Sequence, residues 1–337
     1  MTDQANLAVE ISDLSVTFAK RIRAVDHVNL VLPKGVAVAL IGESGSGKSV
    51  TMRTIMRLDS AHNTTIEGHI FVNGRDVMGM TKRELTSFRG REVAMIFQDP
   101  LLALDPVYTL GDQIVEAIRQ HEPVGKAEAL KRAQELFERV RIPSARQRLD
   151  AYPHEMSGGM RQRAMIALAL SCRPKVLLAD EPTTALDATV QIQVLLLLRE
   201  LQKEFGLSTV FVTHDLGAAI EVADRIAVMY AGRIVEEGTA EQVALDPRHP
   251  YTIGLLRSRA DGALKKGERL NTIPGSPPDL STLGVSCAFA ERCGFADERC
   301  RRERPPVVEF GDGHRAACFR ADVVAASFGD AKTKVPI

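Results

Sequence analysis

The 337-residue chain lacks several features that mark specialised classes of protein. Its 43 Lys and Arg balance 43 Asp and Glu, so the composition excludes a strongly basic nucleic-acid-binding protein, although a local basic patch is compatible with a neutral total. The sequence contains no run of about 18 or more apolar residues, the length that a membrane-spanning helix needs. The first ten residues, MTDQANLAVE, have neither the basic nor the apolar region of a secretory signal. We therefore expect a cytosolic or membrane-peripheral protein.

What the chain does contain points to an α/β fold. Apolar residues make up 45% and charged residues 26%, which is enough for a sizeable core. Residues 7–41 hold three apolar runs that predict strands, and the Asn73-Gly74 pair predicts a hairpin within residues 66–78. Residues 93–97 predict a buried strand, and residues 109–142 have helical spacing. From residue 175 strands and helices alternate, which favours a largely parallel sheet.

The strongest local signal is a glycine-rich segment, Gly42-Glu43-Ser44-Gly45-Ser46-Gly47-Lys48-Ser49, which matches the P-loop pattern. It follows a predicted strand and precedes a helix-like stretch, as the motif requires. Glycines let backbone N–H groups turn toward phosphate oxygens, and the helix N-terminus adds a favourable dipole. We expect Lys48 to reach the β- and γ-phosphates of a nucleotide and the Ser49 hydroxyl to bind Mg²⁺.

A second signal is the apolar run 176–179, which ends in the carboxylates Asp180 and Glu181. Such a strand end suits a magnesium-associated acid beside a base that activates water. We expect Asp180 to hold Mg²⁺ through its water shell and Glu181 to polarise the attacking water. A solvated strand end would give the same pattern, so this interpretation depends on the P-loop.

Between these motifs lies Ser157-Gly158-Gly159-Met160, directly before an apolar helix. Ser-Gly-Gly at a helix start resembles the signature motif of ABC-type ATPases, which P-loop kinases and GTPases lack. Further motifs of that family occur in the family's order over about residues 7–258. They are an adenine-stacking aromatic at Phe18, a Q-loop at Phe97-Gln98, a D-loop at Ala185-Leu186-Asp187 and a switch histidine in Thr213-His214-Asp215.

The resemblance implies a fold and a division of the chain. The fold is α/β, with a P-loop ABC-type ATPase core, an antiparallel β subdomain, a helical subdomain at about residues 100–157 and a small Cys-rich C-terminal extension. The ATPase domain would span residues 1–258 and the oligopeptide-permease-type extension residues 259–337.

The resemblance also implies a mechanism. Two ATPase domains close head-to-tail around two ATP molecules, and hydrolysis opens them. Each ATP lies on one subunit's P-loop and faces the other subunit's signature (Ser157, Gly158 and Gly159) and Asp187. Gln98 would sense Mg²⁺, as a ligand together with Ser49 and Asp180, and His214 would contact the γ-phosphate.

The branch of the family with the greatest resemblance is the peptide/nickel importer ATPases, the oligopeptide and dipeptide permeases. Its markers are residues 180–187, His249-Pro250-Tyr251-Thr252 and the Pro/Gly-rich segment 273–278, together with the Cys-rich end. Met160, where the family usually has Gln, resembles the first of the two non-identical ATPase subunits of such importers. The transported solute, whether a dipeptide, a longer peptide, a nickel complex or another solute, is not encoded in these motifs.

The resemblance implies several partners. They are a homologous second ATPase subunit, two integral-membrane permease subunits and an extracytoplasmic solute-binding protein, with this chain peripheral at the cytoplasmic face of the cell membrane. An ABC ATPase acting on nucleic acid or the ribosome is disfavoured, because the chain has one P-loop, no long heptad run and no net basic charge. A sensor role for the tail is compatible with import.

Four of the five cysteines, Cys287, Cys293, Cys300 and Cys318, lie in the last fifth of the chain. In a reducing compartment clustered cysteines favour a metal site over disulfides. Their spacing lacks the close pairs usual for zinc, and four thiolates can also hold an iron–sulfur cluster. Because members of this importer group carry a [4Fe–4S] cluster in the corresponding tail, the resemblance favours that cluster, with zinc second. Thiols that simply pack as small apolar groups remain the alternative.

Overall fold

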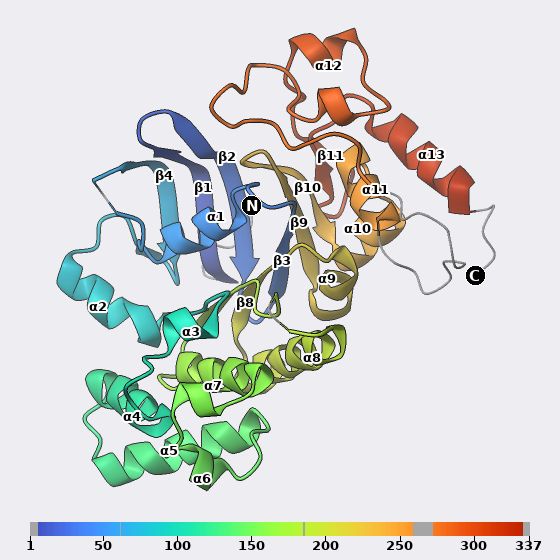
Figure 1. Ribbon diagram of the computed structural model, residues 1–337. Helices are drawn as coiled ribbons and strands as arrows, with labels where there is room; N and C mark the ends of the chain where they lie inside the picture. The colour runs from blue at the N-terminus through green and yellow to red at the C-terminus, as the bar shows by residue number, and fades with distance from the viewer. Residues whose placement is uncertain (1–5, 61, 185, 259–271, 333–337) are drawn as a thin grey trace.

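The computed structural model of the chain describes residues 6–60, 62–184, 186–258 and 272–332 (Figure 1). Its main sheet has the strand order β11-β12-β10-β9-β3-β8-β7-β6. The strands from β9 to β6 run parallel, whereas β10, β12 and β11 add antiparallel strands. The strands are β3 (Ala37–Ile41), β6 (Val93–Ile96), β7 (Val176–Asp180), β8 (Ser208–Thr213), β9 (Arg225–Tyr230), β10 (Arg233–Thr239), β11 (Val308–Glu309) and β12 (Arg315–Ala316).

A smaller antiparallel sheet has the order β2-β1-β4-β5. Its strands are β1 (Leu7–Phe18), β2 (Ile22–Pro33), β4 (Thr64–Val72) and β5 (Arg75–Asp76). Asn73 and Gly74 have φ values of 49° and 76°, the left-handed conformation that a tight hairpin turn requires. The hairpin predicted at this pair is therefore confirmed.

Helices cover both faces of the main sheet. The helices that lie between β6 and β7 in the sequence form a separate lobe (Figure 1). That lobe contains α3 (Pro100–Ala103), α4 (Leu110–His121), α5 (Lys126–Arg139), α6 (Ala145–Arg148), η2 (Pro153–Glu155) and α7 (Gly158–Leu170). The other helices before residue 259 are α1 (Lys48–Ile55), α2 (Lys82–Arg91), α8 (Ala188–Phe205), α9 (Leu216–Val222), α10 (Ala240–Leu245) and α11 (Pro250–Arg257). Within the described ranges, none of the helices combines the length and apolarity of a bilayer-spanning segment.

Three apolar clusters hold these layers together. One joins the smaller sheet and α1 to one face of the main sheet. A second joins the helical lobe and α8 to the opposite face, and Phe137 of α5 is fully buried in it. The third lies around α9 and α11 and includes Phe289 of the C-terminal region. The predicted strand at residues 93–97 and the helices within residues 109–142 are confirmed by β6, α4 and α5. A largely parallel sheet is buried on both faces, which explains the continuous apolar run in β6.

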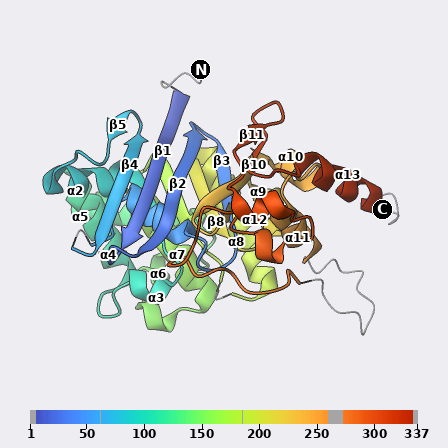
Figure 2. The same ribbon diagram turned by 90° about the horizontal axis from the view of Figure 1, so that it is seen from above.

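The C-terminal region continues the main sheet, which the sequence pattern did not predict. It contains η3 (Ala290–Arg292), α12 (Glu298–Arg302), β11, β12 and α13 (Ala321–Lys332). Strand β12 pairs with β10, and Figure 2 shows the region beside β10 and α11, away from α2 and α5. The carboxylate of Glu236, buried on β10, lies 2.9 Å from His314 Nε2 and accepts the backbone N–H groups of Arg248 and His249.

We expect Phe137→Ala to destabilise the helical lobe by about 3–5 kcal/mol, because it leaves a cavity where a fully buried ring packed. Denaturant unfolding followed by circular dichroism measures the loss. Leu102→Ala is the matched control, since Leu102 is 87% exposed and its truncation opens no cavity. Equal stability of the two variants would contradict the packing described for α5.

Candidate nucleotide-binding site

The P-loop connects β3 to α1. Two of its glycines are required, because a side chain would collide with neighbouring backbone and because Gly47 has a positive φ angle. A Cβ on Gly42 would lie 2.1 Å from the carbonyl oxygen of Met229. Gly47 has φ 103°, and a Cβ there would lie 2.5 Å from the carbonyl oxygen of Ala24. The loop therefore packs against β2 and β9 too closely for side chains, and this packing fixes where α1 begins.

Hydrogen bonds from Lys48 hold the loop together, and one from Ser49 connects it to the end of strand β7. Lys48 Nζ donates to the carbonyl oxygens of Gly42 (2.8 Å) and Glu43 (2.9 Å). Burial lowers the pKa of Lys48, and the nearby carboxylates of Glu181, Asp180 and Glu43 oppose that shift. Ser49 Oγ donates to Asp180 Oδ1 at 2.8 Å, which joins the first turn of α1 to the end of β7.

Asp180 is buried, and burial raises the pKa of its carboxyl group. The neighbouring carboxylate of Glu181 raises it further, whereas the hydrogen bond from Ser49 and the charges of Arg53 and Lys48 lower it. A cation bound beside Asp180 would stabilise its ionised form by the same electrostatic effect.

Glu181 stands at the centre of a polar cluster. Gln98 Nε2 donates to Glu181 Oε2 at 3.1 Å, and Thr184 Oγ1 donates to the same oxygen at 2.9 Å. His214 Nδ1 lies 3.9 Å from Oε2, and Lys48 Nζ lies 4.0 Å from Oε1. Residues predicted from four separate motifs therefore meet at one carboxylate, and Thr184 is a member of the cluster that sequence reasoning missed.

The backbone of Glu181 is held in an unusual conformation. Its φ is 44°, in the left-handed region that costs a non-glycine residue about 1–3 kcal/mol. Its N–H donates to the carbonyl oxygen of Val212 at 3.0 Å, so pairing with β8 helps to hold this conformation. Such conformations cluster at functional sites, where the surrounding structure fixes a side chain in place.

The site fits magnesium and a polyphosphate. Ser46 has a buried hydroxyl with no hydrogen-bond partner among the described residues, inside the loop expected to hold phosphate. Ser49 and Asp180 supply the oxygen ligands that Mg²⁺ prefers, and Gln98 is bonded to Glu181 instead. The described residues contain no group of three His, Cys, Asp or Glu side chains placed to hold a metal ion. A magnesium ion bound to nucleotide needs no such group, because it keeps waters and phosphate oxygens as ligands.

The predicted in-trans residues lie at helix starts. Ser157 is exposed at the N-terminus of α7, where its Oγ accepts the N–H of Met160 at 3.3 Å. Gly158 and Gly159 form the first turn of that helix. Asp187 caps α8 and accepts the N–H of Val190 at 3.0 Å. Ala185 of the expected D-loop lies outside the described residues.

Phe18 ends β1, and its ring is half-buried against the core between the sheets. Its pairing partners are Ile22 on β2 and Thr64 on β4. This position leaves part of the ring accessible, so stacking on an adenine remains a prediction.

The four clustered cysteines line one small cavity of about 10 Å³, with Phe289 and Phe319 among its other walls. All four are free thiols. Burial raises the pKa of Cys287, of Cys293 and, to about 12, of Cys318. Cys172, which the sequence did not group with them, is buried beside Ala117.

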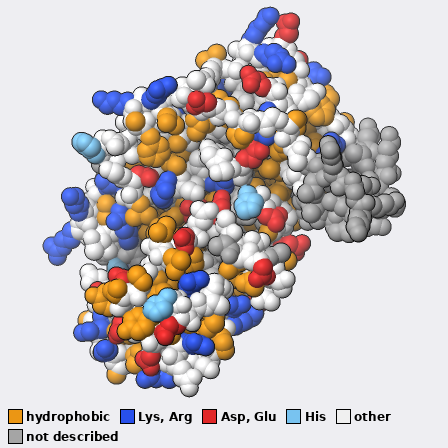
Figure 3. Space-filling view, in the orientation of Figure 1, with side chains coloured by type: hydrophobic (Ala, Val, Ile, Leu, Met, Phe, Trp, Pro, Cys, Tyr) orange, Lys and Arg blue, Asp and Glu red, His pale blue; other side chains and the backbone are white. Residues whose placement is uncertain are grey.

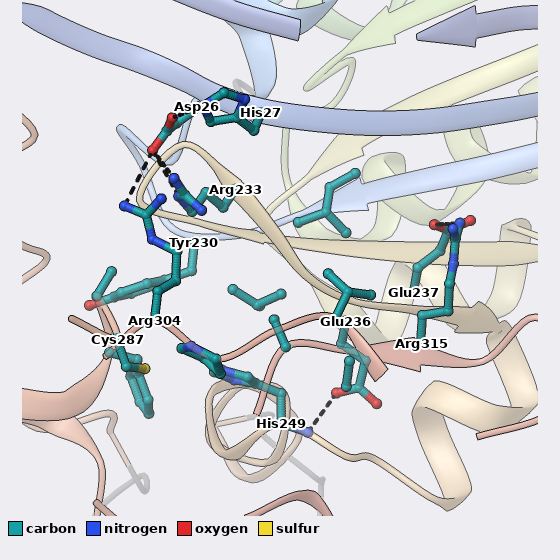
Figure 4. Close-up of a pocket in the computed structure, with 18 of the residues that line it drawn as sticks. Asp26, His27, Tyr230, Arg233, Glu236, Glu237, His249, Cys287, Arg304 and Arg315 are labelled. Carbon is teal, nitrogen blue, oxygen red and sulfur yellow. Dashed lines mark hydrogen bonds and ion pairs between the residues drawn. The ribbon is translucent and has the colours of Figure 1, made fainter. Parts of the chain in front are cut away.

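Another cavity, of about 260 Å³, lies between β10 and the C-terminal region (Figure 4). Asp26 binds Arg233 at its rim, and Arg304 approaches the same carboxylate to 3.8 Å. Glu236 and His249 also line this cavity. The approach of Arg304 to Asp26 therefore brings the C-terminal region next to β2, beside the end of the cavity that β10 forms.

Comparison with known proteins identifies the family. Residues 25–184 match the ABC transporter family, and residues 235–300 match the C-terminal region of oligopeptide/dipeptide transporters. The oligopeptide transport ATP-binding protein OppD of Salmonella typhimurium is 46% identical over 321 residues, which cover 94% of each chain. The chain belongs to the ABC transporter ATPases, in the branch of the peptide import ATP-binding proteins.

Other relatives agree with this assignment. OppD of Bacillus subtilis is 46% identical over 310 residues, covering 91% of this chain and 87% of the relative. A Brucella abortus protein, provisionally named a peptide import ATP-binding protein, is 49% identical over 321 residues, covering 92% and 95%.

Solved structures show the same ATPase fold. The ATP-binding cassette MJ0796, solved as a dimer in a post-hydrolysis state bound to ADP and Pi, is 29% identical, with a TM-score of 0.62 over 69% of this chain and 98% of that one. The cbiO1 protein of Clostridium perfringens, at 24% identity, has a TM-score of 0.63 over 71% of this chain and 90% of that one, and shows the fold alone.

We expect Lys48→Ala to weaken ATP binding about 100-fold or more, because removal of charged hydrogen bonds costs about 1.5–3 kcal/mol each. Titration of the purified chain with a fluorescent ATP analogue measures this loss. Lys175→Ala is the control, because Lys175 is exposed and pairs with Glu92 far along the chain from the P-loop. Retained affinity in Lys48→Ala would contradict the assignment of this phosphate site.

Proposed function

We propose that this ABC ATPase is the energy-coupling subunit of an importer for peptides or related small solutes. The observation that carries the catalytic part is the Glu181 carboxylate, which contacts Gln98 and lies within 4.0 Å of Lys48 and His214 beside the P-loop. The importer part rests on the C-terminal match at residues 235–300 and on relatives named for oligopeptide transport.

The roles proposed for individual residues follow from this geometry. The loop from Gly42 to Ser49 binds the phosphates through its backbone N–H groups, through the Ser46 hydroxyl and through Lys48. Magnesium, held by Ser49 and Asp180 and approached by Gln98, would neutralise charge on the phosphate oxygens. We propose that Phe18 stacks on the adenine.

We propose that Glu181 is the general base. Its carboxylate would take a proton from the attacking water, and the hydrogen bonds from Gln98 and Thr184 fix the direction of that carboxylate. His214, 61% exposed at the end of β8, would contact the γ-phosphate.

The signature Ser157-Gly158-Gly159 and Asp187 would act on the ATP of a second subunit. The start of α7 is exposed, and a helix N-terminus with free N–H groups binds phosphate favourably. Closure follows because ATP interacts with both subunits only in the closed state, and hydrolysis removes that difference in affinity. The dimer described for the cassette MJ0796 with ADP and Pi supports such an assembly.

The proposed partners are a homologous ATPase subunit, two integral-membrane permeases and, through them, an extracytoplasmic solute-binding protein. An exposed apolar patch directly after Gln98 supports permease contact, and Figure 3 shows apolar side chains over this lobe. The patch consists of Leu101, Leu102, Val107 and Tyr108, which are 53%, 87%, 69% and 56% exposed. Exposed apolar side chains that gather in one part of a surface are typical of protein interaction sites. We therefore propose a peripheral position at the cytoplasmic membrane face.

We also propose the division of the chain into an ATPase domain at residues 1–258, with a helical subdomain at about 100–157, and a C-terminal extension at 259–337. The elements α3 to η2 within residues 100–155 support the subdomain. The segment that follows the boundary, residues 259–271, lies outside the described residues. Met160 in the signature would mark this chain as the first of two non-identical subunits.

We expect Glu181→Gln to keep ATP affinity but to lower turnover about 100-fold or more, because loss of a general base typically costs that much. With the sister ATPase subunit and Mg-ATP, the variant should accumulate as a closed dimer in small-angle scattering. Lys48→Ala/Glu181→Gln is the control and should stay open. Unchanged turnover would remove Glu181 from the base role, and absence of closure would overturn the in-trans assembly.

We further propose that Cys287, Cys293, Cys300 and Cys318 hold a [4Fe–4S] cluster. The four thiols surround one cavity. Three of the sulfurs each accept a hydrogen bond from the backbone N–H of the residue two positions after the cysteine. These donors are Phe289 for Cys287, Phe295 for Cys293 and Arg320 for Cys318. Such hydrogen bonds stabilise thiolates and tune cluster potentials. Among the described residues the thiols do not form a group placed to hold a metal ion, so binding of a cluster would require them to move together.

Anaerobic purification should give a brown protein with broad visible absorbance, and Cys293→Ser should lose that absorbance and about 4 iron atoms per chain, the iron content of such a cluster. Cys172→Ser should keep both, because Cys172 lies outside the cavity. A colourless protein that holds zinc would overturn the cluster in favour of zinc. A protein without either metal would leave the thiols as packing groups.

A further inference from the structure

The first residue after Gly42 in the P-loop, Glu43, is bound by the C-terminal region. Arg292 Nη1 donates to Glu43 Oε2 at 2.6 Å and Nη2 donates to Glu43 Oε1 at 2.9 Å, a two-bond pair between residues 249 positions apart. The Arg292 side chain is 5% exposed and that of Glu43 is 29% exposed. A buried, bidentate pair of this kind is stronger and more directional than a surface ion pair.

Arg292 is itself rigidly placed. Its Nε donates to the carbonyl oxygen of Pro274 at 2.8 Å, and Nη1 also donates to Tyr230 Oη at 3.3 Å. The guanidinium lies 5.8 Å from the ring centres of both Tyr230 and Phe289. Contacts on several sides therefore hold the guanidinium where it meets Glu43, so that little side-chain entropy remains to be lost on pairing.

The backbone of Glu43 is held from the same side. Its N–H donates to Tyr251 Oη at 2.7 Å, and Tyr251 is completely buried on α11. The Tyr251 ring packs against Tyr230 and Phe289, with centres 4.6 and 5.4 Å apart. The carbonyl oxygen of Glu43 accepts from Lys48 Nζ. One loop residue thus connects the phosphate-binding lysine with α11 and η3.

Because the Glu43 side chain carries a negative charge, its pairing with Arg292 affects how well the P-loop binds a nucleotide. Glu43 lies within the P-loop, and its backbone carbonyl oxygen accepts from Lys48 Nζ at 2.9 Å, so its carboxylate is also near the site of a polyphosphate. An unpaired carboxylate there would repel the phosphates and attract the ammonium of Lys48 away from them. Arg292 neutralises this charge and turns the carboxylate toward η3.

We propose that Arg292 is a positioning residue for ATP binding, which neutralises Glu43 and holds the P-loop from the C-terminal region. The region is therefore part of the nucleotide site's support. This proposal rests on ATP binding at the P-loop and does not depend on the transported solute, on the base role of Glu181 or on a metal at the cysteines.

The test is steady-state ATPase kinetics of the full chain in its complete transporter complex, with direct titration of a fluorescent ATP analogue. Arg292→Gln should raise the KM and Kd for ATP about five- to tenfold with kcat within about twofold, because loss of roughly 1–1.4 kcal/mol of ground-state support corresponds to that factor. Arg292→Lys should recover part of the affinity, since it keeps the charge without the two-bond geometry.

The double variant Arg292→Gln/Glu43→Gln separates positioning from simple folding. Without the carboxylate there is no unpaired charge, so its Kd for ATP should return to within about twofold of the parent. Arg302→Gln is the matched control, because Arg302 is 75% exposed in the same region and pairs with the exposed Glu298. It should leave the Kd unchanged.

Two outcomes would overturn the proposal. One is a folded Arg292→Gln variant, checked by circular dichroism and thermal unfolding, that binds ATP as the parent does. The other is a double variant as weak as Arg292→Gln, which would mean that neutralisation of Glu43 is not how Arg292 supports ATP binding. Parent protein that fails to bind ATP at all would instead refute the phosphate site itself.

Discussion

The structure depends on the alignment of four neighbouring parallel strands. In the order β3-β8-β7-β6, their carboxyl ends lie along one edge of the main sheet. The P-loop follows β3, His214 follows β8, Asp180 ends β7 with Glu181 directly after it, and Gln98 follows β6. The strand register sets the ends of β3, β8 and β7 level, since Ile41 pairs with Thr213 and Asp180 pairs with Val212. Residues from four parts of the chain thereby reach one carboxylate without long loops.

This alignment explains how much of the site could be predicted. The P-loop is a local pattern, so Lys48 and Ser49 are predicted from neighbouring residues, whereas the prediction for Asp180 also depends on the presence of the P-loop. The roles of Gln98 and His214 come only from the order of motifs in a family. Their meeting at Glu181 is seen only in the structure, because no local pattern encodes a pair 83 positions apart. The left-handed backbone of Glu181 could not be predicted, since Glu rarely adopts it and a distant contact, the hydrogen bond to Val212, helps to hold it.

The C-terminal region was the least predictable part. Its sequence lacks a strong apolar period, and it is joined to distant segments by charged and polar contacts as well as by Phe289, for example Glu236 with His314 and Glu43 with Arg292. Contacts across 78 and 249 positions leave no trace in local spacing. Clustering of the four cysteines was visible in the sequence, but their arrangement around one cavity depends on how η3, α12 and the segment before α13 fold together.

The pairing of β12 with β10 has a further consequence for handling of this protein. A strand at the margin of a sheet exposes backbone N–H and C=O groups that can template pairing with other chains. Here the long strand β10 is covered by β12, and the new margin is the two-residue strand β11. Shortened versions of the chain that end before residue 308 would leave β10 uncovered, and self-association during expression would follow from that bare margin rather than from misfolding of the ATPase core.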